Sequence, residues 1–250
     1  MPASGTSFAG RGSMIEAIRN FVTHPVAIGT WLALDAVALV ILLVDFKRRN
    51  PEIMSLMKVV WTLTVLYSGF IGLAIYWFTG RKQISRDSLW RKGFRSTAHC
   101  YSGCGAGEIA GVLIAIGVFS FGNIGVSILT FSLAYVAGFG LTMGPLMQDG
   151  EGFGAALKDA AYSETASIAV MEIVAVGVDL WLAGNAKMNE PLFWSSLVVS
   201  LTLGLAAAYP VNLLLIKFGI KEGMHNPKEM AKHAHEDSHE GGHEQAGQTG

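Results

Sequence analysis

The chain has 250 residues, of which 51% are hydrophobic and only 15% charged, and its net charge is −1. Soluble domains carry about a quarter charged residues, so the composition argues against a soluble globular protein. Two cysteines are too few for a disulfide framework. The sequence contains no GxxxxGK[ST] or GxSxG pattern, which favours a protein that is not an enzyme. The near-zero charge indicates no particular partner, and we expect no nucleic-acid binding.

Six stretches with few charged residues are long enough to cross a membrane. A helix rises 1.5 Å per residue and the hydrocarbon core is about 30 Å thick, while lipid offers the backbone no hydrogen-bond partner. We therefore predict an all-α fold, a polytopic transmembrane helical bundle of about six spans. The stretches are 26–44, 57–78, 98–121, 123–147, 160–183 and 192–216.

In chain order, the sequence divides into four parts. Residues 1–79 form an N-terminal segment and a transmembrane hairpin, closed by the turn dipeptide Asn50-Pro51. Residues 80–95 form a basic cytoplasmic linker, and residues 96–223 a four-helix transmembrane domain. Residues 224–250 are polar and rich in histidine, so we expect a disordered tail.

The distribution of basic residues predicts an orientation. With six spans, 13 Lys and Arg residues fall on one side of the membrane and 5 on the other. Because basic loops stay in the cytoplasm, we predict a multi-pass protein of the inner (cytoplasmic) membrane with both termini cytoplasmic. The run Lys47-Arg48-Arg49 opposes this orientation.

The first predicted span contains Asp35, and the predicted third span carries a row of chemically active side chains. Cys100, Cys104 and Glu108 recur at i, i+4 and i+8, and therefore lie on one face of a helix. The two thiols are consistent with small buried hydrophobic groups, metal ligands or redox-active thiols. An adjacent face has the glycine spacing that lets helices pack closely: Gly103, Gly107 and Gly111.

Ligands for a soft metal ion are expected at similar depth. Thiolate and thioether sulfur select Cu(I), and imidazole suits copper or zinc. The sequence therefore predicts a vestibule that binds copper, the one cofactor we consider. Its ligands would be His99, Cys100, Cys104, Met143, Met147 and Glu108. Alternatively, Met143 and Met147 fill irregular gaps beside Pro145. The tail adds a loose metal-binding tract, which alternatively only solvates the chain: His233, His235, His239 and His243.

Polar side chains within the later spans form another group of candidates. A charge at the bilayer centre costs about 2.5–3.5 kcal/mol on insertion scales, so such residues face the bundle interior and mark ion or proton paths. The alternative is a protonated carboxyl that is hydrogen-bonded between helices. Besides Asp35 and Glu108, the candidates are Ser163, Glu172, Asp179 and Asn212.

One stretch resembles a family signature. Residues His99-Cys100-Tyr101-Ser102-Gly103-Cys104-Gly105-Ala106-Gly107-Glu108 are similar to the HCxxGCxxG[DE] pattern of the domain of unknown function 4396 family. Two further blocks, 155–166 and 209–224, fit the same family, although Ala160 stands where the family tends to place an acid. The resemblance implies a bacterial or archaeal polytopic membrane protein and no established activity.

Three functions follow from these residues. The first, which we favour, is a membrane protein that binds or transports a soft metal ion such as copper. The second is a non-catalytic structural or assembly subunit, with the glycine row as its contact with other membrane subunits or with a second copy. The third is a membrane thiol oxidoreductase that uses Cys100 and Cys104. In all three, the lipid bilayer is the common partner.

Overall fold

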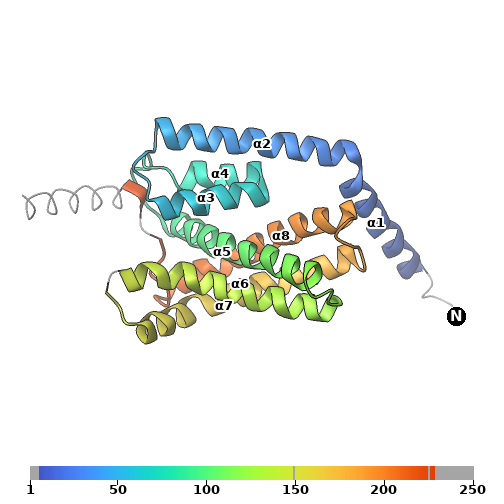
Figure 1. The fold of residues 1–250 in the computed structure, drawn as a ribbon. Helices are drawn as coiled ribbons and strands as arrows, with labels where there is room; N and C mark the ends of the chain where they lie inside the picture. Colours follow the sequence, from blue (N-terminus) through green and yellow to red (C-terminus); the bar gives the residue numbers. More distant parts are fainter. Residues whose placement is uncertain (1–5, 149, 225, 229–250) are drawn as a thin grey trace, which may run out of the picture.

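The computed structural model describes residues 6–148, 150–224 and 226–228. Within these residues the chain forms eight helices and no strand (Figure 1). They are α1 (Thr6–Thr23), α2 (Pro25–Arg48), α3 (Ser55–Ser68), α4 (Phe70–Thr79), α5 (Leu89–Gly117), α6 (Asn123–Gln148), α7 (Phe153–Ala183) and α8 (Pro191–Lys217). Five of the described helices, α2 and α5–α8, are long and apolar enough to cross a membrane. The predicted all-α polytopic bundle is confirmed.

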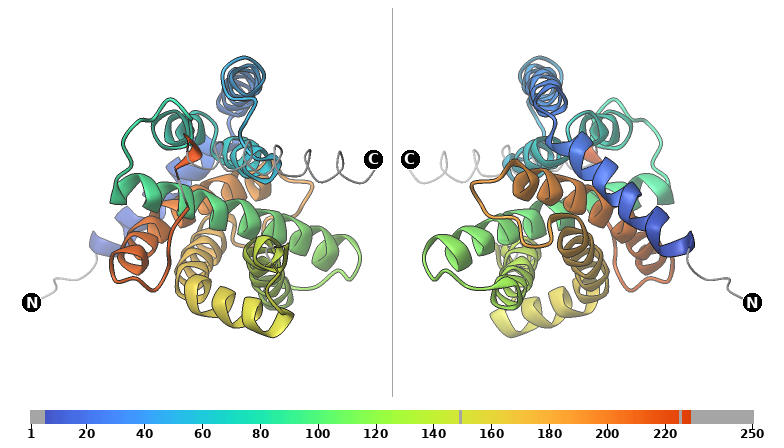
Figure 2. Two further views of the ribbon diagram at one scale, coloured as in Figure 1. Left: turned by 90° about the vertical axis from the view of Figure 1, so that its left-hand side faces the viewer. Right: turned by 90° about the vertical axis from the view of Figure 1, so that its right-hand side faces the viewer.

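Helices α5–α8 form an antiparallel four-helix unit, with α2 and the short helices on one side of it (Figures 1 and 2). Short connections join successive helices, which makes neighbours antiparallel. Pro191 begins α8 at a position where its missing N–H costs nothing. α5 begins at Leu89, so it takes in the second half of the predicted linker 80–95.

The glycine row of α5 is a packing surface within the chain. A Cβ atom at Gly107 would lie 2.4 Å from the carbonyl oxygen of Leu133, and one at Gly111 would lie 2.7 Å from Cα of Thr130. Both neighbours belong to the backbone of α6, so the two helices approach more closely than any side chain would allow. The row is therefore occupied by α6 rather than free for another subunit.

The stretch 57–78 is not a single span as expected. α3 ends at Ser68, and Gly69 adopts a positive φ of 57° that L side chains rarely adopt. α4 then runs back to the end where α3 began, where the backbone N–H of Lys82 donates to Oδ1 of Asn50 at 3.0 Å. Helices of 14 and 10 residues are too short to cross a core of about 30 Å. Together they form a helical hairpin whose two ends lie at the same end of the molecule.

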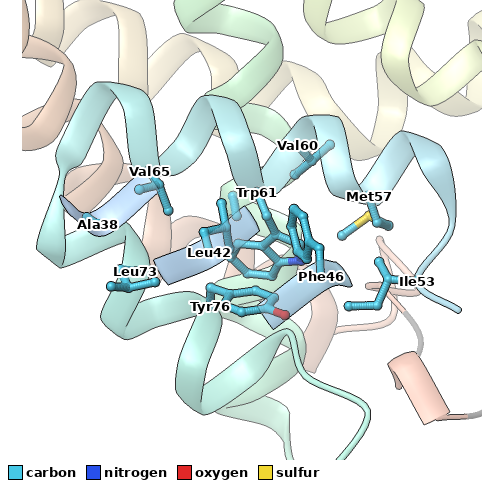
Figure 3. Close-up of a cluster of buried hydrophobic side chains, with 11 residues drawn as sticks. Ala38, Leu42, Phe46, Ile53, Met57, Val60, Trp61, Val65, Leu73 and Tyr76 are labelled. Atoms are coloured by element: carbon cyan, nitrogen blue, oxygen red, sulfur yellow. The ribbon is translucent and has the colours of Figure 1, made fainter. Parts of the chain in front are cut away.

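The hairpin packs against α2 through an apolar cluster (Figure 3). The ring of Tyr76 makes edge contacts with Phe46 and Trp61, with centroids 5.4 Å apart in each pair. At the cluster's polar edge, the Tyr76 hydroxyl donates to Asp45 at 2.7 Å, and Arg81 forms an ion pair with Asp45 at 2.9 Å. This buried network fixes the end of α4 to the end of α2.

The hairpin changes the number of candidate spanning helices from the expected six to five. With five spanning helices, α2 begins and α8 ends at opposite ends of the bundle (Figure 1), whereas six spans would put both chain ends on one side. We call the end that holds segments 49–54, 80–88 and 218–224 the basic end. Of the described basic residues, only Arg11, Arg19 and Lys187 lie in segments at the opposite end.

Candidate functional site

A column of buried polar side chains runs through the α5–α8 bundle. Residues on one helix face recur every three or four positions, and on both α5 and α7 such a face points into the bundle. We call this set the polar column. It consists of His99, Cys100, Cys104, Glu108, Thr142, Glu164, Ser167, Glu172, Asp179, Ser196, Asn212 and Lys221.

The column begins at the basic end with a buried ion pair. Nζ of Lys221 lies 2.6 Å from Oε2 of Glu164, and the two residues are 8% and 3% exposed. The Lys221 ammonium also donates to Oδ1 of Asn212 at 3.0 Å. On the other side of the carboxylate, the Thr142 hydroxyl donates to Oε1 of Glu164 at 3.2 Å. The ammonium is therefore held by oxygens from two helices.

The chain reaches this position by turning back after α8. Gly219 and Gly223 have φ values of 70° and 76°, a left-handed conformation that glycine adopts at helix ends. The N–H groups of Ile220 and Lys221 both donate to the carbonyl of Leu215, at 2.9 and 3.2 Å. This reversal places Lys221 beneath the last turn of α8, facing into the bundle.

His99 completes this first layer. Its side chain is buried, and it interacts electrostatically with Glu164 and Lys221. Its Nδ1 neither accepts nor donates a hydrogen bond among the described residues. A buried polar atom without a partner costs about 1–3 kcal/mol, so His99 is a polar group available to something that enters the layer.

The two thiols form the next layer. Sγ of Cys100 lies 3.9 Å from Sγ of Cys104 and 3.7 Å from the hydroxyl of Ser167. Met171 belongs to the same buried cluster. The predicted thioether ligands are elsewhere, because Met143 packs with Ala156 and Ala160.

The predicted vestibule is thus only partly assembled. Met147 is 45% exposed, and of the six predicted ligands the structure brings the two cysteines into direct contact. Across the described chain, no three His, Cys, Asp or Glu side chains are grouped closely enough to hold a metal ion. The four tail histidines proposed as loose ligands lie outside the described residues.

Two deep carboxyl groups form the third layer. Glu108 and Glu172 are 3% and 0% exposed, and within the described chain neither takes part in an ion pair. Neither oxygen of Glu172 accepts a hydrogen bond from a described N–H or O–H group, and the Cys104 thiol is its polar neighbour. Oε2 of Glu108 also lacks a described partner.

The column ends at a small cavity near the opposite end. The cavity has a volume of ≈ 30 Å³ and is lined by Glu108, Asp179, Ser127 and Thr130 among others. This is room for about two water molecules. Asp179 accepts a hydrogen bond from the Ser196 hydroxyl at 2.6 Å. Polar side chains of the column therefore follow one another through the bundle, from Lys221 at the basic end to this cavity.

Two predicted candidates lie off the column. Asp35 is buried against the hairpin, where its Oδ1 lies 3.5 Å from the position that a Cβ of Gly69 would take. Ser163 is half-buried and donates to the carbonyl of Asp159 within its own helix. Both residues are therefore separate from the path between Glu164 and Glu172.

Sequence reasoning missed five members of the column: Thr142, Glu164, Ser167, Ser196 and Lys221. Glu164 follows Ser163 in the block that was quoted for the family, and its spacing from Glu172 and Asp179 places all three on one face of α7. That periodicity was visible in the sequence. The position of Lys221 was not, because it depends on the reversal after α8.

The chain belongs to the family described as Domain of unknown function (DUF4396), whose pattern matches residues 89–221, more than half of the chain. The match starts where α5 starts and ends at Lys221, so it covers the whole polar column and leaves out α1–α4. No curated protein and no solved structure matches the chain at significant similarity.

Proposed function

We propose that this protein moves a cation across the membrane along the polar column. The observation that carries the proposal is the pair of buried carboxyl groups, Glu108 and Glu172, neither of which has an ion-pair partner among the described residues. Uncompensated carboxylates are costly within a membrane and typically mark ion or proton paths. A cation that passes between them would offset this cost.

The layers give the path an order. A cation that enters at the basic end would meet Glu164 first, then the hydroxyl of Ser167, and then Glu172. Glu108 lines the same cavity as Asp179, so the cation would be released into water from there, near the opposite end. At each step the cation moves between oxygen atoms of neighbouring layers. It therefore does not cross a region without polar ligands.

Replacing Glu172 with Gln tests the transport function. Purified protein in liposomes would be assayed for movement of protons and of monovalent cations with entrapped fluorescent indicators. We expect Glu172→Gln to slow the flux by about tenfold or more, equivalent to at least about 1.4 kcal/mol on the barrier. The matched control is Glu190→Gln, an exposed acid at the start of α8. Parental flux in Glu172→Gln, or no flux in the parent, overturns the proposal.

We propose Cu(I) binding at the two thiols as a second candidate. The distance of 3.9 Å between the sulfurs of Cys100 and Cys104, with Met171 in the same cluster, offers the soft ligands that Cu(I) prefers. Replacing both cysteines with serine should abolish stoichiometric Cu(I) uptake under reducing conditions. Equal uptake by protein with and without the two cysteines would refute a thiol site.

The other two predicted roles have less support. The glycine row that would have contacted a partner subunit is filled by α6. The thiols are 2% and 0% exposed, and thiol–disulfide exchange needs access for an attacking sulfur. The subunit and oxidoreductase readings therefore rank below cation transport.

We further propose that the basic end faces the cytoplasm. Basic segments are retained on the cytoplasmic side, and the segments at this end include Lys47, Arg48, Arg49, Arg81 and Lys82. This orientation places α1 outside the cytoplasm and lets a cation enter the column from the Lys221 side. It applies to the inner (cytoplasmic) membrane expected from the family resemblance.

A further inference from the structure

The ammonium group of Lys221 contacts two side-chain oxygens, and two hydroxyl groups lie beside the carboxylate that it contacts. We call the Glu164, Asn212, Thr142 and Ser167 side-chain oxygens the cage. Oε2 of Glu164 and Oδ1 of Asn212 lie 2.6 and 3.0 Å from Nζ. The Thr142 hydroxyl lies 3.2 Å and the Ser167 hydroxyl 3.5 Å from the same carboxylate. These oxygens come from α6, α7 and α8, and all four side chains are buried or half-buried. A site with one carboxylate and several neutral oxygens matches the chemistry of a single positive charge.

We propose that this cage is a binding site for a free monovalent cation of ammonium or potassium size, and that Lys221 is a tethered ion that occupies it when no cation is bound. The inference rests on the proposed transport function and names the class of its substrate. An alkylammonium head offers three of the four N–H donors of an ammonium ion, and a potassium ion is of similar radius. The site that holds one therefore accommodates the others.

Electrostatics makes the two occupants alternatives. Glu164 is 3% exposed, so removing its partner leaves an uncompensated buried charge, which is strongly unfavourable. The carboxylate therefore keeps one cation at all times. When a free cation enters the cage, Lys221 must leave it, because a second positive charge would repel the first at close range. Three further titratable groups among the described residues, all from α5, face this site. His99 and Cys104 interact electrostatically with Glu164, and Cys100 lies 3.7 Å from the Ser167 hydroxyl.

The link to α8 is suited to such an exchange. Lys221 lies a few residues beyond the end of α8, between Gly219 and Gly223, and glycine permits a change of backbone conformation at little cost. A short tether holds the ammonium at a high effective concentration. Lys221 thus competes with the free cation and closes the column at low cation concentration.

The test uses the full-length protein in detergent with Lys221 replaced by methionine, which is similar in length and uncharged. Lys221→Met should bind ⁸⁶Rb⁺ or labelled methylammonium stoichiometrically, at least about tenfold more tightly than the parent because the tethered competitor is gone. Adding Glu164→Gln should abolish this binding. Lys217→Met, which removes an exposed lysine of the same segment, should bind as the parent does.

Thermal unfolding gives a second readout. Lys221→Met should unfold at a lower temperature than the parent in N-methylglucamine chloride, whose cation is too large for the cage. Rubidium or ammonium should restore much of the loss, because ligands that bind only the folded state stabilise it. If Lys221→Met binds neither probe and its stability is the same in all three salts, Lys221 is a structural clamp and the inference is wrong.

The parent protein provides a test that does not depend on a variant folding. The amine of Lys221 should react faster with an acetylating reagent in rubidium or ammonium chloride than in N-methylglucamine chloride, while Lys217 serves as the internal reference in the mass spectrum. Unchanged acetylation of Lys221 also overturns the inference. The comparison of rubidium with ammonium identifies the cation. Since Glu172 lies deeper in the column, a flux that depends on Glu172 but shows no effect at Lys221 would leave the transport function standing.

Discussion

The ion pair between Glu164 and Lys221 gives a prediction about stability at the level of single residues. Glu164→Gln keeps the shape of the side chain but leaves the Lys221 ammonium buried without a counter-charge, which should cost about 3–5 kcal/mol of unfolding free energy. The double variant Glu164→Gln/Lys221→Met should recover much of this loss. Denaturation in detergent, followed by circular dichroism, measures both.

A control separates charge from hydrogen bonding. Thr142→Val removes one hydrogen bond to the Glu164 carboxylate but leaves the ion pair in place, and it should cost about 1.5–3 kcal/mol, less than the loss of the counter-charge. If Glu164→Gln costs no more than Thr142→Val, the ion pair contributes little and the charge argument fails.

The same residues show what the sequence could and could not reveal. The row Cys100, Cys104 and Glu108 followed from helical spacing alone, because side chains four residues apart share a face. Which helix that face meets could not be read from spacing. Met143 has the right residue type and depth, but its face of α6 turns toward Ala156. The deep acids were recognised one by one, whereas their alignment in a column depends on how α5 and α7 are rotated.

At the level of helices, the contact between α5 and α6 gives the next prediction. Gly107→Ala should destabilise the protein by about 1–3 kcal/mol or more, because the new methyl group meets the backbone of Leu133 and Ala134. Gly140→Ala is the matched control, since no atom lies within 4 Å of its added Cβ. That variant should be neutral or more stable, as alanine favours helix by about 1 kcal/mol. Equal effects in thermal unfolding would contradict the proposed close packing.

The hairpin shows the limit of hydropathy as a guide to helices. Residues 57–78 are mostly apolar and contain a single charged residue, Lys58, so they have the composition of a span. The break at Gly69 depends on a backbone conformation, and a lone glycine is also common in uninterrupted membrane helices. What stabilises the reversed course is tertiary: Tyr76 and Trp61 share the apolar cluster on α2. A hydropathy average over neighbouring residues does not detect such contacts between segments distant in sequence.

At the scale of the whole molecule, the hairpin explains a conflict in the charge pattern. Counting six spans put Lys47-Arg48-Arg49 on the side with few basic residues. In the structure this run lies beside segment 80–88, as the contact between Gln83 and the carbonyl of Arg49 shows. The basic residues of both segments therefore lie at the same end of the molecule. The six-span count separated this run from segment 80–88, whereas the structure brings the two segments together.

The five-span arrangement makes a topology prediction that differs from the six-span one at two positions. A single cysteine at Asn20 should react with a membrane-impermeant maleimide in intact cells that express the protein, while one at Arg49 should react only after permeabilisation. Six spans with cytoplasmic termini predict the reverse at both. Asn189→Cys, outside in either arrangement, and Ser85→Cys, inside in either, are the controls, and all four positions are exposed. The native cysteines are 2% and 0% exposed, so the unaltered chain should stay unlabelled. Labelling of Arg49→Cys but not of Asn20→Cys in intact cells would mean that α3 and α4 do not form a re-entrant hairpin in the membrane.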